Sequence, residues 1–130
     1  MQARKPKVYE MKRDMDLVRD LLMYIENDPT FDGQSWQNLE LPDEMYDKHR
    51  TEEIAYHVGL LIEAGFIRGQ LGATAPTISK LTWNGHEFLD NIKDRDIWHK
   101  AKQRIKGLPG VALTVVAEIA KEEIRKKLGL

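Results

Sequence analysis

The side chains best able to do chemistry in this 130-residue sequence are four histidines: His49, His57, His86 and His99. A histidine metal site on one element usually shows two of them at i and i+4 or as a His-x-His pair, and neither spacing occurs here. Cysteine is absent, which excludes a cysteine zinc site, a disulfide framework and a thiolate nucleophile. We therefore expect no metal and no cofactor.

Closely spaced aspartates are the other candidates for catalysis. Asp14 with Asp16, and Asp94 with Asp96, lie two residues apart, so the members of each pair fall on different faces of a helix. This spacing favours helix capping over paired acid–base catalysis. The central glycines form neither phosphate-binding loop motif. Without a nucleophile–base pair or a ligand cluster, we expect that the protein is not an enzyme.

Hydrophobic periodicity predicts a mostly helical domain with a small β-hairpin. The helix that follows Thr82 either continues through Ile105 or restarts near residue 96, and the sequence leaves both alternatives open. Helices are expected from Asp14 to the Asn27-Asp28-Pro29 stop, from the cap Thr51 to Gly65, from the cap Thr82, and over Val111–Leu128; strands are expected over Phe66–Leu71 and Ile78–Thr82, with a short strand ending at Pro42.

This order of elements is that of a winged helix-turn-helix domain. The run from His57 to Arg68, followed by Leu81-Thr-Trp-Asn-Gly-His-Glu-Phe-Leu89, resembles the recognition helix, wing and next helix of many bacterial winged-helix regulators. In that pattern a glycine ends the recognition helix and a threonine caps the helix after the wing. The resemblance implies a winged-helix domain over residues 11–95 and a DNA-binding function like that of transcription regulators.

A second resemblance starts at Met11 and covers most of the chain. The opening Met11-Lys-Arg-Asp-Met-Asp-Leu-Val-Arg19, the Tyr56-His57 pair, and Leu81-Thr82 with Gly85 are similar to an uncharacterised bacterial and phage family known as a domain of unknown function. This resemblance implies a cytoplasmic protein, often linked to a prophage. It supplies no established activity and no functional residues.

The outer side of the recognition helix and the wing are the expected contact surfaces. That helix carries acids and no lysine or arginine, so it is poorly suited to DNA phosphates. The alternative is a protein-interaction module whose acidic face binds a basic partner. For Tyr56 and His57 we favour packing at the edge of the core over contact with a partner. The candidate contact residues are Glu52, Glu53, Tyr56, His57 and Leu60 on the helix, and Arg68, Gln70, Thr74, Thr77 and Lys80 on the wing.

Charge is segregated along the chain, although the formal net charge is only −1. Residues 1–13 carry five basic and one acidic side chain, residues 14–96 carry seven and seventeen, and residues 97–130 carry eight and three. Residues 1–10 are expected to be a flexible basic leader. Because phosphate binding needs local positive charge, any DNA binding should depend on the two basic ends.

Residues 96–130 are predicted to be a helical extension beyond the winged-helix domain. Its apolar stripe either packs on the same subunit or on a second subunit in a homodimer, and the sequence leaves both open. The longest apolar stretch is too short to span a bilayer, so we expect no membrane association. The stripe consists of Leu113, Val116, Ala120, Ile124 and Leu128.

Overall fold

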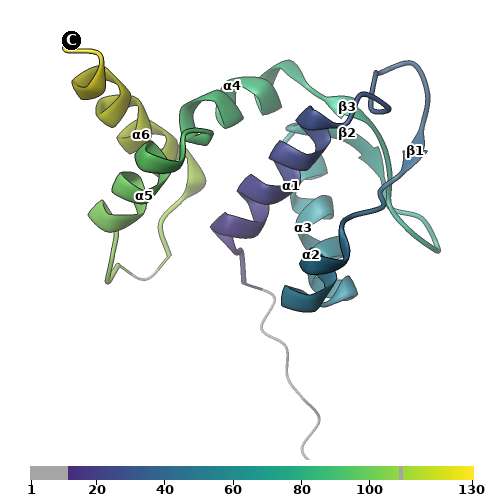
Figure 1. The fold of residues 1–130 in the computed structure, drawn as a ribbon. Helices are drawn as coiled ribbons and strands as arrows, with labels where there is room; N and C mark the ends of the chain where they lie inside the picture. The colour runs from purple at the N-terminus through teal and green to yellow at the C-terminus, as the bar shows by residue number, and fades with distance from the viewer. Residues whose placement is uncertain (1–11, 109) are drawn as a thin grey trace, which may run out of the picture.

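The computed structural model describes residues 12–108 and 110–130, and Figure 1 shows a mostly helical molecule with a small antiparallel sheet at one side, opposite the C-terminal helices. The predicted mostly helical fold with a β-hairpin is confirmed. The predicted basic leader, residues 1–10, lies outside the described residues. In chain order the elements are α1 (Met15–Asn27), β1 (Gln37–Asn38), α2 (Asp43–Lys48), α3 (Thr51–Glu63), β2 (Ile67–Gln70), β3 (Thr77–Leu81), α4 (Trp83–Ile92), α5 (Arg95–Arg104) and α6 (Leu113–Lys127).

Helices α1 and α3 form the centre of the hydrophobic core. α1 packs against α3, α4 and β3, and α3 also packs against β2. Leu17, Leu21 and Leu22 of α1 and Val58 of α3 are completely buried. In α3 the buried apolar residues Ile54, Val58 and Leu61 are three, four or seven residues apart, which places them on one side of the helix. Each buried side chain of this size stabilises the fold by about 1.5–3 kcal/mol.

The sheet is a hairpin with one short added strand. Its strand order is β1-β3-β2, and both pairings are antiparallel. A bulge between Arg68 and Gly69 shifts the register of the hairpin. The strand predicted ahead of Pro42 is present, but only as two residues, Gln37 and Asn38. Both residues of β1 are exposed, and the Gly33 amide also donates to the Ser79 carbonyl of β3 (2.9 Å).

A tight junction connects the end of α3 to the start of α4. Gly65 has a φ of +75°, which a residue with a Cβ adopts only at a cost. The Thr82 amide donates to the Phe66 carbonyl (3.0 Å), and the Thr82 hydroxyl accepts from the Gly85 amide (3.1 Å). A Cβ at Gly85 would lie 2.0 Å from the Phe66 carbonyl oxygen. The predicted helix stop at Gly65 and the predicted cap at Thr82 are both confirmed.

Two other helix ends refine the predictions. Thr51, predicted as the cap of α3, is instead its first helical residue; Arg50 is at the cap position and makes no capping bond through its side chain. The helix after Thr82 does not continue, because α4 ends at Ile92 and a new helix begins at Arg95. The Asp94 carboxylate causes this restart by accepting from the Ile97 amide (3.0 Å).

Helix α6 packs against α4 and α5 of the same chain. Figure 1 shows α5 and α6 side by side, on the side of α4 away from the hairpin. Of the predicted stripe, Val116 and Ala120 are buried, Leu113 and Ile124 are half-buried, and Leu128 is exposed. The buried part of the stripe is therefore covered without a second subunit, and the homodimer stays a prediction.

Polar side chains of α1 connect the core to the C-terminal helices. Arg19 donates to the carbonyl oxygens of Ile92 (2.9 Å) and Lys93 (2.6 Å), so it satisfies carbonyls that the end of α4 leaves without helical partners. Asp16 accepts from Trp98 Nε1 (2.7 Å) and Lys102 Nζ (2.8 Å). Burial raises the pKa of Asp16, but these two hydrogen bonds and the positive charges of Lys102 and Arg19 together outweigh it, so the pKa lies below its ordinary value.

The substitution Gly85→Ala tests the α3–α4 junction. The added methyl group would overlap the Phe66 carbonyl, so α4 or the turn must shift, and we expect a loss of at least about 1–3 kcal/mol in the free energy of unfolding. Urea unfolding followed by circular dichroism measures it. Gly72→Ala is the matched control, because a Cβ at Gly72 meets no atom within 4 Å. Equal stability of the two variants would contradict the junction's role.

The substitution Asp16→Asn tests the link between α1 and α5. The folded-state pKa of Asp16 is depressed, so its charge stabilises the protein above the unfolded-state pKa, and this contribution disappears as the pH falls through the folded-state pKa. Asp16 is 58% exposed, so we expect less than about 1 kcal/mol at pH 7. Urea unfolding should show the difference from wild type narrowing between about pH 5 and pH 2. A difference independent of pH would argue against the link.

Candidate functional site

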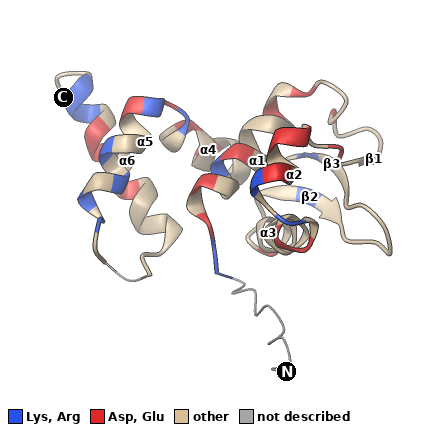
Figure 2. Cartoon of the chain, turned by 60° about the horizontal axis from the view of Figure 1, so that its bottom comes forward, with Lys and Arg blue, Asp and Glu red and all other residues tan. Residues whose placement is uncertain are grey.

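The outward face of α3 is acidic and apolar. Glu52, Tyr56 and Glu63 are exposed on it, and Gly59 and Leu60 are half-buried beside them. Figure 2 shows lysine and arginine along α5 and α6, whereas α3 carries only acidic charges. The face was predicted to be acidic, and in the structure the carboxylates of Glu52 and Glu63 are exposed on it. It presents carboxylates and apolar surface together.

His57 lies inside the core and does not contact the surface. Its side chain is completely buried; Nε2 accepts from the Asp14 amide (2.8 Å), and Nδ1 donates to the Glu53 carbonyl (2.8 Å). The prediction that His57 contacts a partner is therefore wrong. Its burial agrees with the alternative, in which His57 packs in the protein. Tyr56 is 38% exposed and meets the His57 ring edge-on, with ring centroids 5.8 Å apart.

An apolar groove of about 390 Å³ runs between α3 and the β2 end of the hairpin. The absence of a side chain at Gly59 makes room for it, since a Cβ there would lie 3.1 Å from Leu71 Cδ1. Leu71 is 55% exposed and forms the outer wall. The groove was not predicted, because it depends on how closely the hairpin approaches α3. The lining residues are Tyr56, Gly59, Leu60, Ile62, Glu63, Gly69 and Leu71.

The hairpin carries a separate basic and aromatic patch on its outer side. Arg68 and Lys80 face each other across β2 and β3, and both are exposed. The Arg68 guanidinium lies over the Trp36 ring, 5.7 Å from its centroid. Trp36 was predicted only as part of a strand, so its contact with Arg68 is new. The structure therefore groups Arg68 with Lys80, apart from the acidic face of α3.

The remaining hairpin candidates lie farther along the hairpin. Gln70 is exposed and is the register partner of Thr77, which is half-buried. Thr74 is exposed in the turn between the strands. These three polar side chains add hydrogen-bonding groups and no charge. They can support contact with either DNA or a protein.

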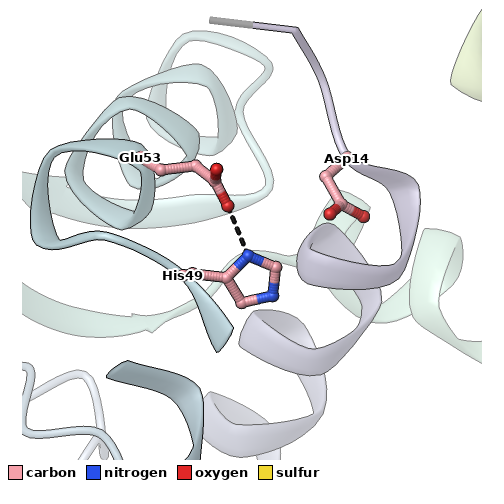
Figure 3. Close-up of side chains that lie close together, drawn as sticks. All are labelled: Asp14, His49 and Glu53. Atoms are coloured by element: carbon pink, nitrogen blue, oxygen red, sulfur yellow. Dashed lines mark hydrogen bonds and ion pairs between the residues drawn. The ribbon is translucent and has the colours of Figure 1, made fainter. Parts of the chain in front are cut away.

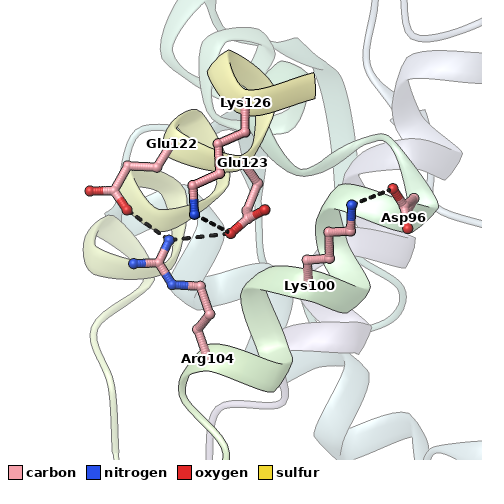
Figure 4. A network of polar contacts seen from close by, with 6 residues as sticks. All are labelled: Asp96, Lys100, Arg104, Glu122, Glu123 and Lys126. Atoms are coloured by element: carbon pink, nitrogen blue, oxygen red, sulfur yellow. Dashed lines mark hydrogen bonds and ion pairs between the residues drawn. The ribbon is translucent and has the colours of Figure 1, made fainter. Parts of the chain in front are cut away.

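The lysines and arginines of the basic C-terminal segment are largely paired with carboxylates of the same chain. Figure 4 shows Arg104 between Glu122 (2.7 Å) and Glu123 (3.4 Å), with Lys126 also bound to Glu123 (3.5 Å). Pairing of this kind reduces the positive field that phosphates would meet. Six of the eight lysines and arginines in residues 97–130 form such pairs: Lys100, Lys102, Arg104, Lys121, Lys126 and Lys127.

Three ionisable side chains from separate elements meet at the N-terminal ends of α1 and α3. Figure 3 shows Asp14, which caps α1, beside His49, which follows α2, and Glu53 of α3. One potential ligand atom from each lies within 4.8 Å of the others. His49 Nδ1 also bonds to the Glu53 carboxylate. The sequence does contain part of this signal, since His49 and Glu53 are four residues apart, but our spacing rule considered only pairs of histidines.

Asp14 and His49 also line a polar cleft of about 590 Å³ between α1, the end of α2, and α5. Lys48, Arg95 and Asp20 contribute charges of both signs to it. Burial raises the pKa of Asp20 above its ordinary value, against a smaller opposing effect of Arg19. The three-residue cluster is therefore open to solvent on the side of α5.

Among the helices of residues 12–108 and 110–130, none is both long enough and apolar enough to cross a membrane.

Comparison with known proteins identifies relatives of unknown function. A protein from Haemophilus influenzae, described as uncharacterized, is 31% identical over 123 residues, which cover 91% of this chain and 99% of that protein. No solved structure matches the chain. The model of the family described as "Hypothetical protein (DUF2513)" matches residues 12–112. This agrees with the resemblance to a family of unknown function, and the chain belongs to the DUF2513 family.

Proposed function

We propose that this protein is a non-enzymatic winged-helix interaction module that binds a basic protein segment on α3. In this interpretation α3 is the recognition helix and the β2–β3 hairpin is the wing. The element order and the Gly65–Thr82–Gly85 junction support the assignment. One observation carries the function: the exposed face of α3 combines Glu52 and Glu63 with an apolar groove.

The chemistry of that face favours a protein over DNA. Duplex DNA carries one negative charge per about 1.7 Å of its axis, and α3 itself contains no lysine or arginine to oppose its carboxylates. Arg50, at the start of the helix, pairs with Glu52 (3.4 Å) and lies far from Glu63 along the chain. A basic peptide would be attracted to the same carboxylates that repel DNA phosphates. Its lysines or arginines would face Glu52 and Glu63 while an apolar side chain enters the groove beside Leu71.

The expected affinity is modest. One buried aliphatic side chain contributes about 1.5–3 kcal/mol, and each exposed ion pair about 0–1 kcal/mol. Because association also costs rotational and translational freedom, one groove contact gives weak binding. The charges should therefore contribute mainly to the rate and orientation of encounter. The partner is then a segment with several cations around its apolar anchor.

DNA binding, as in a transcription-regulator-like factor, is the second candidate, and the hairpin patch favours it. Arg68 and Lys80 can contact phosphates, and Trp36 offers a surface on which a base can stack. This contact would use the wing and leave the acidic face of α3 away from the duplex. The two candidates therefore use different residues.

Fluorescence anisotropy tests the two candidates on the same protein. The first probe is a labelled helical peptide with leucines four residues apart among lysines; the second is a mixed-sequence DNA duplex at about 50 and 200 mM salt. We expect peptide binding that weakens about fivefold or more in Leu71→Ser and in Glu63→Lys, because each removes one contact of the groove. Lys80→Glu is the matched control and should leave peptide binding unchanged.

The outcomes separate the candidates. Failure of the peptide to bind, or binding that Leu71→Ser and Glu63→Lys leave intact, would overturn the interaction module. Binding of DNA at low salt that Lys80→Glu abolishes would establish the wing as the functional surface instead.

A further inference from the structure

We propose that Asp14, His49 and Glu53 form a binding site for one divalent transition-metal ion such as Zn²⁺. The three residues come from the cap of α1, the end of α2 and the first turn of α3. Their potential ligand atoms lie within 4.8 Å of one another (Figure 3). This site is separate from the groove and from the hairpin patch.

The spacing of the ligand atoms is close to what a metal needs. A Zn²⁺ ion lies about 2.0–2.2 Å from each nitrogen or oxygen ligand, so two ligand atoms can be at most about 4.4 Å apart. His49 Nδ1 is hydrogen-bonded to the Glu53 carboxylate, so metal binding through these two atoms would replace that hydrogen bond, and side-chain rotation would bring the ligand atoms into range. The capping bond of Asp14 from the Leu17 amide (3.1 Å) uses Oδ1, and a metal would take Oδ2.

The donor set selects the class of metal. One imidazole nitrogen and two carboxylate oxygens suit Zn²⁺, Co²⁺ or Ni²⁺ better than Mg²⁺ or Ca²⁺, which prefer oxygen ligands alone. The side chain of His49 is only 16% exposed and that of Glu53 31%, so the site is partly removed from water. Two carboxylates held this close repel each other, and a divalent cation between them replaces that repulsion with attraction.

Buried His57 holds two of the three ligands in place. It bonds to the backbone amide of Asp14 and to the backbone carbonyl of Glu53 (both 2.8 Å), and it is completely buried. The main-chain positions of both carboxylates are thus fixed before any ion binds. A site organised in advance loses less conformational freedom on binding, which favours affinity.

The cleft gives the ion a route from solvent. Asp14 and His49 lie on its wall, so coordination positions not taken by protein can hold water. Three protein ligands with an open position are typical of accessible metal sites rather than of closed structural ones. An ion here would also tie the starts of α1 and α3 to the end of α2.

Titration of untagged, metal-free protein with Co²⁺ tests the proposal, because the visible absorption of Co²⁺ reports coordination by protein. We expect absorption bands that saturate at one equivalent and disappear when Zn²⁺ is added, and a melting temperature raised by several degrees in excess Zn²⁺. His49→Gln and Asp14→Asn should each weaken binding at least tenfold. Asparagine caps a helix as well as aspartate, so Asp14→Asn keeps the fold of α1.

His86→Gln is the matched control. His86 also pairs with a carboxylate, Glu26 (3.2 Å), but it belongs to no three-ligand group within the described part of the chain. Metal binding should be unchanged in this variant. Absence of Co²⁺ bands and of a Zn²⁺-dependent melting shift in the wild type would overturn the site, as would binding that survives His49→Gln and Asp14→Asn.

Discussion

The close approach of Gly85 to the Phe66 carbonyl is the constraint on which the arrangement of the surface depends. At this point the turn after α3 and the first turn of α4 pack so tightly that no side chain fits between them. Both ends of the β2–β3 hairpin lie at this junction, because Phe66 precedes β2, Thr82 follows β3, and the Thr82 amide donates to the Phe66 carbonyl. The direction of β2 relative to α3 is thereby fixed, and with it the groove between Gly59 and Leu71.

The placement of charge follows from this framework. Acids remain exposed on α3, whereas Arg68 and Lys80 point outward from the other side of the hairpin. Most C-terminal cations are paired with carboxylates on α1, α5 and α6. The basic C-terminal segment is thus largely neutralised by pairing, whereas the exposed face of α3 stays acidic, and we propose that this face binds a basic partner.

Short sequence patterns predicted the ends of the helices, whereas the composition of the candidate sites depends on tertiary contacts. Gly65 and Thr82 were predictable because a helix stop and a cap depend on a few adjacent residues. The burial of His57 was harder to predict, since both of its backbone partners are set by how α1 and α3 meet. Asp14 and His49 are 35 residues apart in the sequence, and only the packing of the helices brings them together. The sequence therefore indicated only the four-residue spacing of His49 and Glu53.

We propose above that the groove beside α3 is the surface that binds a partner. Amide chemical-shift mapping by NMR tests it most directly, with the lysine–leucine peptide and the DNA duplex titrated separately into labelled protein. We expect the peptide to shift the amide signals of Gly59, Gly69 and Leu71 and to leave that of Lys80 unchanged. Shifts confined to Arg68 and Lys80, or produced by DNA alone, would contradict it.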